Sequence, residues 1–300
     1  MVFNQLIGVR FPVGPPENSM KLLRVGTLKQ EKPAILDKLG IVRDISSVIR
    51  DLNSENINQK TIDLINKTDL SKLPKLSEKL RVGACVPNPQ KFIGIGLNYS
   101  DHAKETDMKA PNEPIIFIKA NSCISGPNDN ILIPKKSKKT DWEIELGIII
   151  GKKTQYITED KAFDHIFGYC IVNDISEREF QIERSGQWDK GKGCDTFGPI
   201  GPYLITKDEI EDVQNLNLEL KLNGKIMQES NTNKMIFGVT YIVAYLSNFM
   251  TLYPGDIITT GTPPGVGMAR TPQVFLKSGD EMILKIDGLG SQRQKVISTV

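Results

Sequence analysis

The arrangement of strand-like segments constrains the fold of this chain more than any other feature of its sequence. From residue 92 onward, short apolar segments recur between turn-forming residues, as is typical of β-strands. One amphipathic helix is expected over about 239–250, where the apolar residues share one face. Because helices do not alternate regularly with the strands, the pattern argues against a doubly wound α/β sheet and predicts an α+β, β-rich body. The expected strands cover residues 92–97, 114–119, 142–151, 167–173, 216–222, 256–260 and 281–287.

The chain is expected to have three parts. Residues 1–19 contain a short, interrupted apolar run that does not suit a signal peptide. We expect a disordered extension there or, by preference, a mis-assigned start that precedes Met20. Residues 20–80 are expected to form a small N-terminal domain and a linker, and residues 81–300 the main domain. A length of 300 residues suits a large domain with a small appendage.

Composition excludes several classes of protein. Lys plus Arg number 38 and Asp plus Glu number 36, so the net charge of +2 offers no basic surface for nucleic acid. The chain has no run of about eighteen apolar residues that could span a membrane. The four cysteines are scattered, as expected of mostly buried thiols in a reducing cytoplasm. Only two histidines are present, so any metal site must rely on carboxylates.

Three acidic residues are candidate metal ligands. Glu143 and Glu145 lie two apart in a strand-like segment, so their carboxylates should point to the same side. Asp174 ends another apolar strand and joins them if the two strands are neighbours. Mg²⁺ prefers such oxygen ligands and keeps waters that a substrate can displace. Judged on spacing alone, a solvated strand face is the favoured alternative.

A histidine and a carboxylate are candidates for proton transfer. Glu105 follows His102 by three residues, so a helical turn would bring the two side chains together. A carboxylate beside an imidazole orients it and raises its basicity, as the activation of water requires. The alternative for His102 is a surface or capping role, and His165 is expected to be structural.

Two glycine-containing loops are candidates for anion binding. Residues 186–193 resemble a nucleotide-binding P-loop but lack its final Ser or Thr and the preceding strand, so nucleotide binding is rejected. Lys192 in this loop is flanked by glycines and can approach an anion closely. In residues 260–267, backbone N–H groups and the Thr262 hydroxyl are candidates for holding a carboxylate. The alternatives are an exposed lysine and a plain Gly/Pro turn.

Several short motifs occur in a specific order along the chain. They are residues 93–99 with 101–102, residues 142–146, residues 168–169 with 173–176, Lys192 with 195–199, and residues 254–258 with 260–263. As an ordered set over roughly residues 20–296, they resemble the fumarylacetoacetate hydrolase family. The similarity is closest to the bacterial branch that handles sugar-derived diketo acids, whose members often carry the label ureidoglycolate lyase. Residues 141–142, 176–178 and 190–192 indicate that branch.

This resemblance implies a fold and a set of residue roles. The fold would be a mixed β-roll like the C-terminal domain of fumarylacetoacetase, with a small N-terminal domain, usually in a homodimer. The roles would be metal binding by Glu143, Glu145 and Asp174, water activation by His102 and Glu105, anion contact by Lys192, and substrate binding by Tyr99, Arg178, Gln181, Gly261 and Thr262. Gly193 departs from the family, in which Ser or Thr commonly follows the lysine.

The implied activity is hydrolysis of a C–C bond in a 2,4-diketo acid, with Mg²⁺ as cofactor and Mn²⁺ as the alternative. The substrate would be an acylpyruvate or a 2,4-diketo-3-deoxy sugar acid, and the products pyruvate and a carboxylic acid. Ureidoglycolate lyase and oxaloacetate decarboxylase remain alternatives on the same metal site, although His102 and Glu105 favour hydrolysis. A non-catalytic, metal-stabilised binder of sugar acids is a further alternative. A small 2-oxo acid partner, a homodimer and a cytoplasmic location are the corresponding expectations.

Overall fold

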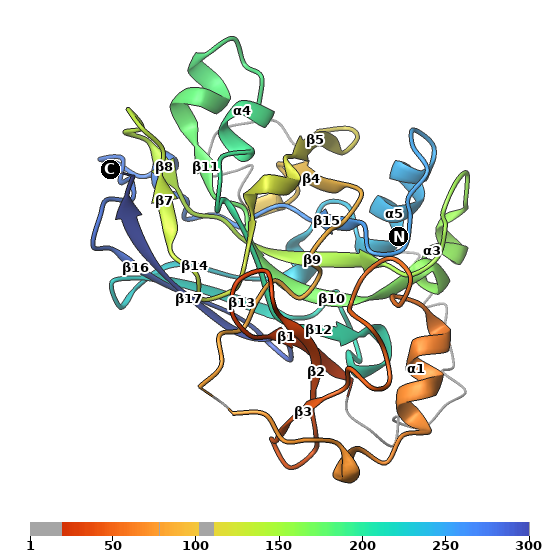
Figure 1. Cartoon of the computed structure of the whole chain (residues 1–300). Coiled ribbons are helices and arrows are strands. Elements are labelled where there is room, and N and C mark those ends of the chain that lie inside the picture. Colours follow the sequence, from red (N-terminus) through yellow and green to blue (C-terminus); the bar gives the residue numbers. More distant parts are fainter. Residues whose placement is uncertain (1–19, 78, 102–110, 300) are drawn as a thin grey trace.

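A ten-stranded sheet occupies the centre of the computed structural model, which describes residues 20–77, 79–101 and 111–299 (Figure 1). Its central strands are antiparallel, except that β15 runs parallel to β4, and short β6 (Ile124–Ser125) pairs with β12 off the main path. Across the sheet the order is β3 (Val42–Asp44), β2 (Lys32–Leu36), β1 (Lys21–Val25), β12 (Gly198–Thr206), β10 (Ile166–Asn173), β9 (Ile144–Ile150), β15 (Ile257–Thr259), β4 (Phe92–Gly96) and β5 (Ile115–Lys119).

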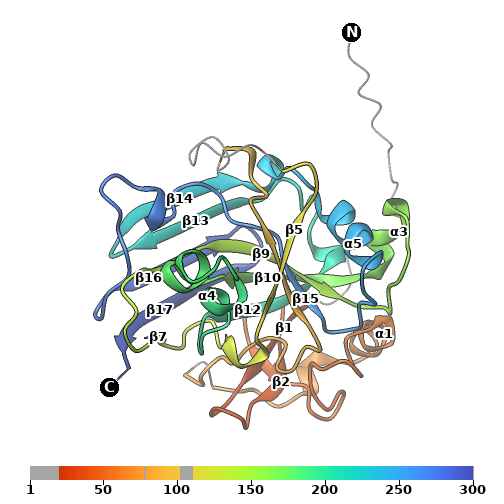
Figure 2. The same cartoon turned by 90° about the horizontal axis from the view of Figure 1, so that it is seen from above.

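A second, five-stranded sheet lies against the middle of the first (Figure 2). Its order is β14 (Lys225–Asn231), β13 (Asn217–Leu222), β16 (Glu281–Ile286), β17 (Gly290–Ser298) and β7 (Ile131–Ile133). Alternate leucines of β13 are buried against the first sheet, as the sequence pattern indicates. Asn223 and Gly224 connect β13 to β14 with φ angles of 50° and 80°, the left-handed backbone that a tight hairpin turn requires.

Buried glutamines connect the second sheet to the ends of β9 and β10. Gln292 Nε2 donates to the Ile171 carbonyl at 2.9 Å, and Gln228 Oε1 accepts from Ile144 N at 3.0 Å. Gln294 Oε1 accepts from Asn173 Nδ2 at 3.1 Å. Buried polar groups of this kind are costly unless they are hydrogen-bonded, so each pair fixes one position of the two sheets. The fixed strand ends carry the acidic residues predicted as metal ligands.

Helices lie around the sheets and are short. Helix α5 (Val239–Ser247) confirms the helix expected near 239–250, and it packs beside α3 (Glu159–His165) in both views (Figures 1 and 2). The other helical segments are α1 (Gln59–Asn66), α4 (Asp189–Lys192), a single π-helical turn η3 (Glu179–Glu183), and the 3-10 turns η1 (Leu70–Lys72), η2 (Asn121–Cys123), η4 (Lys207–Glu209), η5 (Thr232–Lys234) and η6 (Gly267–Ala269). Within the described ranges, no helix is long and apolar enough to cross a membrane.

The β-rich α+β fold predicted from the sequence is confirmed, and each of the seven expected strand ranges contains a strand. The two-stranded ribbon of β8 (Thr140–Asp141) and β11 (Ser176–Glu177) adds a third small sheet. At the N-terminus, β1 pairs with β12, so residues 21–44 extend the large sheet. The division at residue 80 into two domains stays a prediction.

Candidate metal and substrate site

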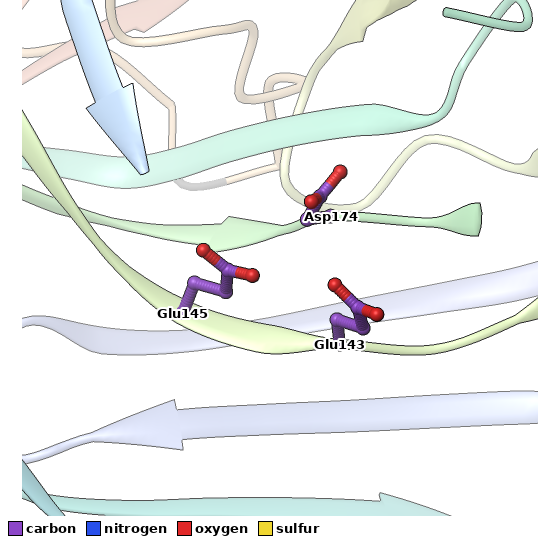
Figure 3. Close-up of side chains that lie close together, drawn as sticks. All are labelled: Glu143, Glu145 and Asp174. Carbon is purple, nitrogen blue, oxygen red and sulfur yellow. The ribbon is translucent and has the colours of Figure 1, made fainter. Parts of the chain in front are cut away.

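The ends of two neighbouring strands bring the three predicted acidic ligands together. Glu143 directly precedes β9, Glu145 lies on it, and Asp174 directly follows β10. The antiparallel pairing of β9 with β10 places Asp174 beside Glu143, whose carbonyl accepts from Asp174 N at 2.9 Å. The three carboxylates converge, with one oxygen of each within 4.8 Å of the others (Figure 3). They are at most 6% exposed, so the alternative of a solvated strand face is wrong.

Cations already pair with two of these carboxylates. The Lys192 ammonium lies 2.7 Å from Glu143 Oε2 and 2.6 Å from Asp174 Oδ2. Fully buried Lys119, at the end of β5, lies 2.5 Å from Asp174 Oδ1 and donates to the Lys192 carbonyl. Arg178 Nη2 lies 2.7 Å from Glu143 Oε1. Glu143 and Asp174 therefore each have two cationic partners, as buried charges require.

Glu145 differs because it has no ion pair within the described residues. Its Oε2 accepts from Thr259 Oγ1 at 2.5 Å and from Gly261 N at 2.6 Å. Burial and the nearby charges of Asp174 and Glu143 raise the pKa of Glu145 well above its usual value. In Glu143, burial has the same upward effect, but Lys192 and Arg178 outweigh it and lower the pKa to about 2. Without a further cation the protonated form of this buried carboxyl is favoured, and a divalent metal would favour its ionised form, so the cluster fits a divalent metal site.

Arg178, the second cationic partner of Glu143, is held in place by further hydrogen bonds. Its Nε donates to Asp141 Oδ2 at 2.9 Å, and its Nη1 donates to Gln181 Oε1 at 3.0 Å. Asp141 in turn accepts from the backbone N–H groups of Gly267 and Met268. The guanidinium therefore has little freedom to reorient. Gln181 lies on the π-helical turn η3, a type of distortion that is frequent at functional sites.

The loop predicted to hold a substrate carboxylate has other partners here. Gly261 N donates to Glu145, as described above, and the Thr262 hydroxyl donates to the Ile144 carbonyl at 2.9 Å while it accepts from Gln228. These contacts fix the end of β9. Substrate binding by Gly261 and Thr262 stays a prediction and would require an exchange of hydrogen bonds.

Tyr99 is buried close to the carboxylates. Its hydroxyl has no hydrogen-bond partner among the described residues. Burial, then the charges of Glu145 and Asp101, raise its pKa well above the usual value, so the phenol stays protonated and available as a donor. His102 and Glu105, the predicted water-activating pair, lie outside the described residues.

One cavity of about 120 Å³ gathers most of the predicted residues. Its polar lining consists of Glu143, Glu145, Arg178, Gln181, Lys192 and Thr262. Two residues of the cluster, Lys119 and Asp141, were not among the predicted site residues. Their sequence signals are weak, since Lys119 ends an apolar strand and Asp141 belongs to a motif that indicates a family branch but no residue role.

Comparison with known proteins gives a consistent result over most of the chain. The family model described as fumarylacetoacetate (FAA) hydrolase C-terminal matches residues 91–297. A Burkholderia cenocepacia protein provisionally named a hydrolase is 56% identical over 276 residues, which is 92% of this chain and 98% of that protein.

Two solved structures resemble the whole described body. A fumarylacetoacetate hydrolase from the psychrophile Exiguobacterium antarcticum is 34% identical with a TM-score of 0.85, and the match covers 94% of this chain and all of that one. A maleylpyruvate hydrolase from Sphingobium sp. SYK-6, solved with manganese(II) and pyruvate, is 26% identical with a TM-score of 0.78 over 94% of this chain and all of that one.

Proposed function

The chain belongs to the fumarylacetoacetate hydrolase family of enzymes, and from this premise we propose that it hydrolyses a C–C bond of a 2,4-diketo acid with Mg²⁺ as cofactor. The products would be pyruvate and a carboxylic acid. The substrate would be an acylpyruvate or a 2,4-diketo-3-deoxy sugar acid. The similar maleylpyruvate hydrolase, which was solved with manganese(II) and pyruvate, supports both the metal-dependent chemistry and the pyruvate product.

The observation that carries the proposal is the convergence of three buried carboxylates of which one, Glu145, has no cationic partner among the described residues. Glu143, Glu145 and Asp174 would hold the metal, since oxygen-only ligand sets suit Mg²⁺ and Mn²⁺. When bound, the metal would polarise the 2-oxo group and offset negative charge at the oxygens of the substrate. We name Mg²⁺ as the cofactor and Mn²⁺ as the alternative.

The residues of the chain would guide the bond changes. A water oxygen bonds to the distal carbonyl carbon, the bond between that carbon and the methylene breaks, and its electron pair stays on the methylene as pyruvate enolate. A proton then returns to that carbon. We propose that the Lys192 ammonium stabilises the enolate charge, and that Tyr99, Arg178 and Gln181 orient the substrate. His102 and Glu105 would take up and return the proton, a role that rests on the sequence resemblance.

The test is pyruvate release, measured through lactate dehydrogenase after metal removal and again after addition of Mg²⁺ or Mn²⁺. The panel contains acylpyruvates, a 2,4-diketo-3-deoxy sugar acid and oxaloacetate. We expect metal-dependent release of pyruvate and carboxylic acid in equal amounts from at least one 2,4-diketo acid. Release from oxaloacetate alone, with CO₂, would show a decarboxylase instead, and no release from any compound would also contradict the proposal.

We further propose a homodimer, as the family resemblance implies, in the cytoplasm, as the scattered cysteines indicate. A partner nucleic acid or membrane is not proposed, because the net charge is +2 and the sequence has no run of about eighteen apolar residues. A homodimer of a 33.4 kDa chain should give about twice that mass by light scattering coupled to gel filtration. A monomer mass at micromolar concentration would contradict this part of the proposal.

A further inference from the structure

The described lining of the cavity at the acidic cluster consists of two chemically different sets of residues. Apart from the six polar residues named above, the described lining is apolar and consists of Ile95, Leu97, Phe117, Ile182, Trp188 and Met268 together with Gly96, which form the apolar wall. The Phe117 ring of this wall lies close to the polar set, with its centroid 5.0 Å from the Lys192 ammonium. Among the described lining residues, the cationic groups of Lys192 and Arg178 are engaged with carboxylates. A ligand held at one end by the polar set therefore meets apolar surface in the rest of the described lining.

Two glycines of β4 make room for the aromatic part of this wall. Gly94 lies directly opposite Phe117 in the β4–β5 pairing, and a Cβ at Gly94 would overlap the Phe117 ring. A Cβ at Gly96 would lie 2.5 Å from Trp188, so any larger residue there would displace the indole. The two rings lie 5.7 Å apart. Glycine is unfavourable inside a strand, so we explain Gly94 and Gly96 by the space that they leave for the two aromatic rings of the cavity wall.

Backbone strain at Leu97 and the exposure of Ile182 also indicate that the apolar wall contacts a ligand. Leu97 has a φ of 53°, a left-handed conformation that is rare and costly for a bulky residue and that tends to occur at functional sites. Ile182, on the π-helical turn, is 46% exposed although it is strongly apolar. Both side chains line the cavity. Apolar groups held at an opening in this way gain stability when a ligand covers them.

From this wall we infer the chemical class of the acyl half of the substrate: the enzyme prefers acylpyruvates with an uncharged, apolar acyl group, and Trp188 is a specificity-determining residue. The inference rests on the proposed function. A polyhydroxylated acyl chain would lose hydrogen bonds to water and find no polar partners among the described residues of this wall. A second carboxylate would find no cation among the described lining residues that is not already engaged with a carboxylate. The apolar wall thus favours an acylpyruvate as the substrate. The sequence resemblance, by contrast, is closest to the family branch that handles sugar-derived diketo acids.

The test compares kcat/KM for acetylpyruvate and butanoylpyruvate with the values for a 2,4-diketo-3-deoxy sugar acid and for fumarylpyruvate. We expect kcat/KM for butanoylpyruvate to exceed that for acetylpyruvate by about 100-fold or more, since the two differ by two methylenes and each methylene in an apolar pocket contributes about tenfold or more. It should also exceed the values for both polar substrates. In Trp188→Ala the ratio of butanoylpyruvate to acetylpyruvate should fall at least about fivefold, while Trp188→Phe keeps most of it.

The ratio separates acyl recognition from folding and from the metal, because both substrates share the pyruvate half. Phe249→Ala, at an exposed apolar residue on the last turn after α5, is the matched control and should leave the ratio unchanged. If the sugar acid or fumarylpyruvate is the best substrate, or if Trp188→Ala keeps the wild-type ratio, the inference is overturned while the proposed function stands. If no 2,4-diketo acid releases pyruvate, both are overturned.

Discussion

Glu145→Gln is expected to lower kcat/KM for metal-dependent pyruvate release by about 10³-fold or more, equivalent to about 4 kcal/mol of barrier. Glu145 is the one carboxylate of the three without a cationic partner among the described residues, so its charge is the one that a metal would balance. A glutamine can still accept the hydrogen bonds from Thr259 and Gly261. The metal-free variant should therefore unfold at the same temperature as the wild type or higher, because repulsion among three buried carboxylates is relieved.

The control for Glu145→Gln is the loss of a buried carboxylate outside the site. Asp256 is fully buried and accepts from the backbone N–H groups of Lys91 and Tyr253. Asp256→Asn should lower the free energy of unfolding by about 1–3 kcal/mol, because an amide cannot accept both bonds as well, yet turnover at 25 °C should persist. Glu145→Gln is thus expected to lose activity and keep its stability, whereas Asp256→Asn is expected to lose stability and keep its activity. Metal-dependent turnover in Glu145→Gln at more than a tenth of the wild-type rate would contradict the role of the carboxylate.

Lys192→Met is expected to have two opposite effects, slower turnover and tighter metal binding. Turnover should fall about 10²-fold or more, because the ammonium is proposed to stabilise the enolate. Metal affinity, measured by calorimetry, should rise at least about tenfold. The ammonium lies within 2.7 Å of oxygens of both Glu143 and Asp174, where it competes with any other cation. Without it, Arg178 and Lys119 still balance those two carboxylates, so the variant should fold.

Lys190→Met is the matched control for the lysine, since Lys190 lies on the same helix, α4, and is exposed. It donates to the Arg184 carbonyl, so its removal should change neither metal affinity nor turnover beyond about twofold. Weaker metal binding by Lys192→Met than by the wild type would show that the ammonium supports the metal site and does not compete for it.

The sequence alone predicts the strands and the shared side of Glu143 and Glu145, because both depend on short spacings, whereas Asp174 joins the pair only through the family resemblance. Glu143 and Glu145 lie two residues apart, so the strand period alone aligns their carboxylates. The hairpin at Asn223-Gly224 depends on local turn chemistry in the same way. Lys119 could not be found from spacing, since the Asp174 that it pairs with lies 55 residues away and only the folded sheet brings them together.

The apolar wall of the cavity could not be predicted from the sequence for the same reason. Leu97, Phe117, Ile182, Trp188 and Met268 come from separate strands, turns and loops, and each alone is an ordinary apolar residue. The motifs that carry the family resemblance lie around the proposed metal site. They therefore predict how the pyruvate half of a substrate would bind, and they say much less about its acyl half. The burial of the glutamines that join the two sheets could likewise not be predicted from the sequence, because a polar residue is ordinarily expected to be exposed.

The most direct test of the metal site is an anomalous difference map from crystals grown after metal removal and soaked in Mn²⁺. The proposal predicts one peak among the carboxylates of Glu143, Glu145 and Asp174, with the Lys192 ammonium moved away from Glu143 and Asp174. Soaked crystals in which these carboxylates bind no manganese and Lys192 keeps both ion pairs would contradict it.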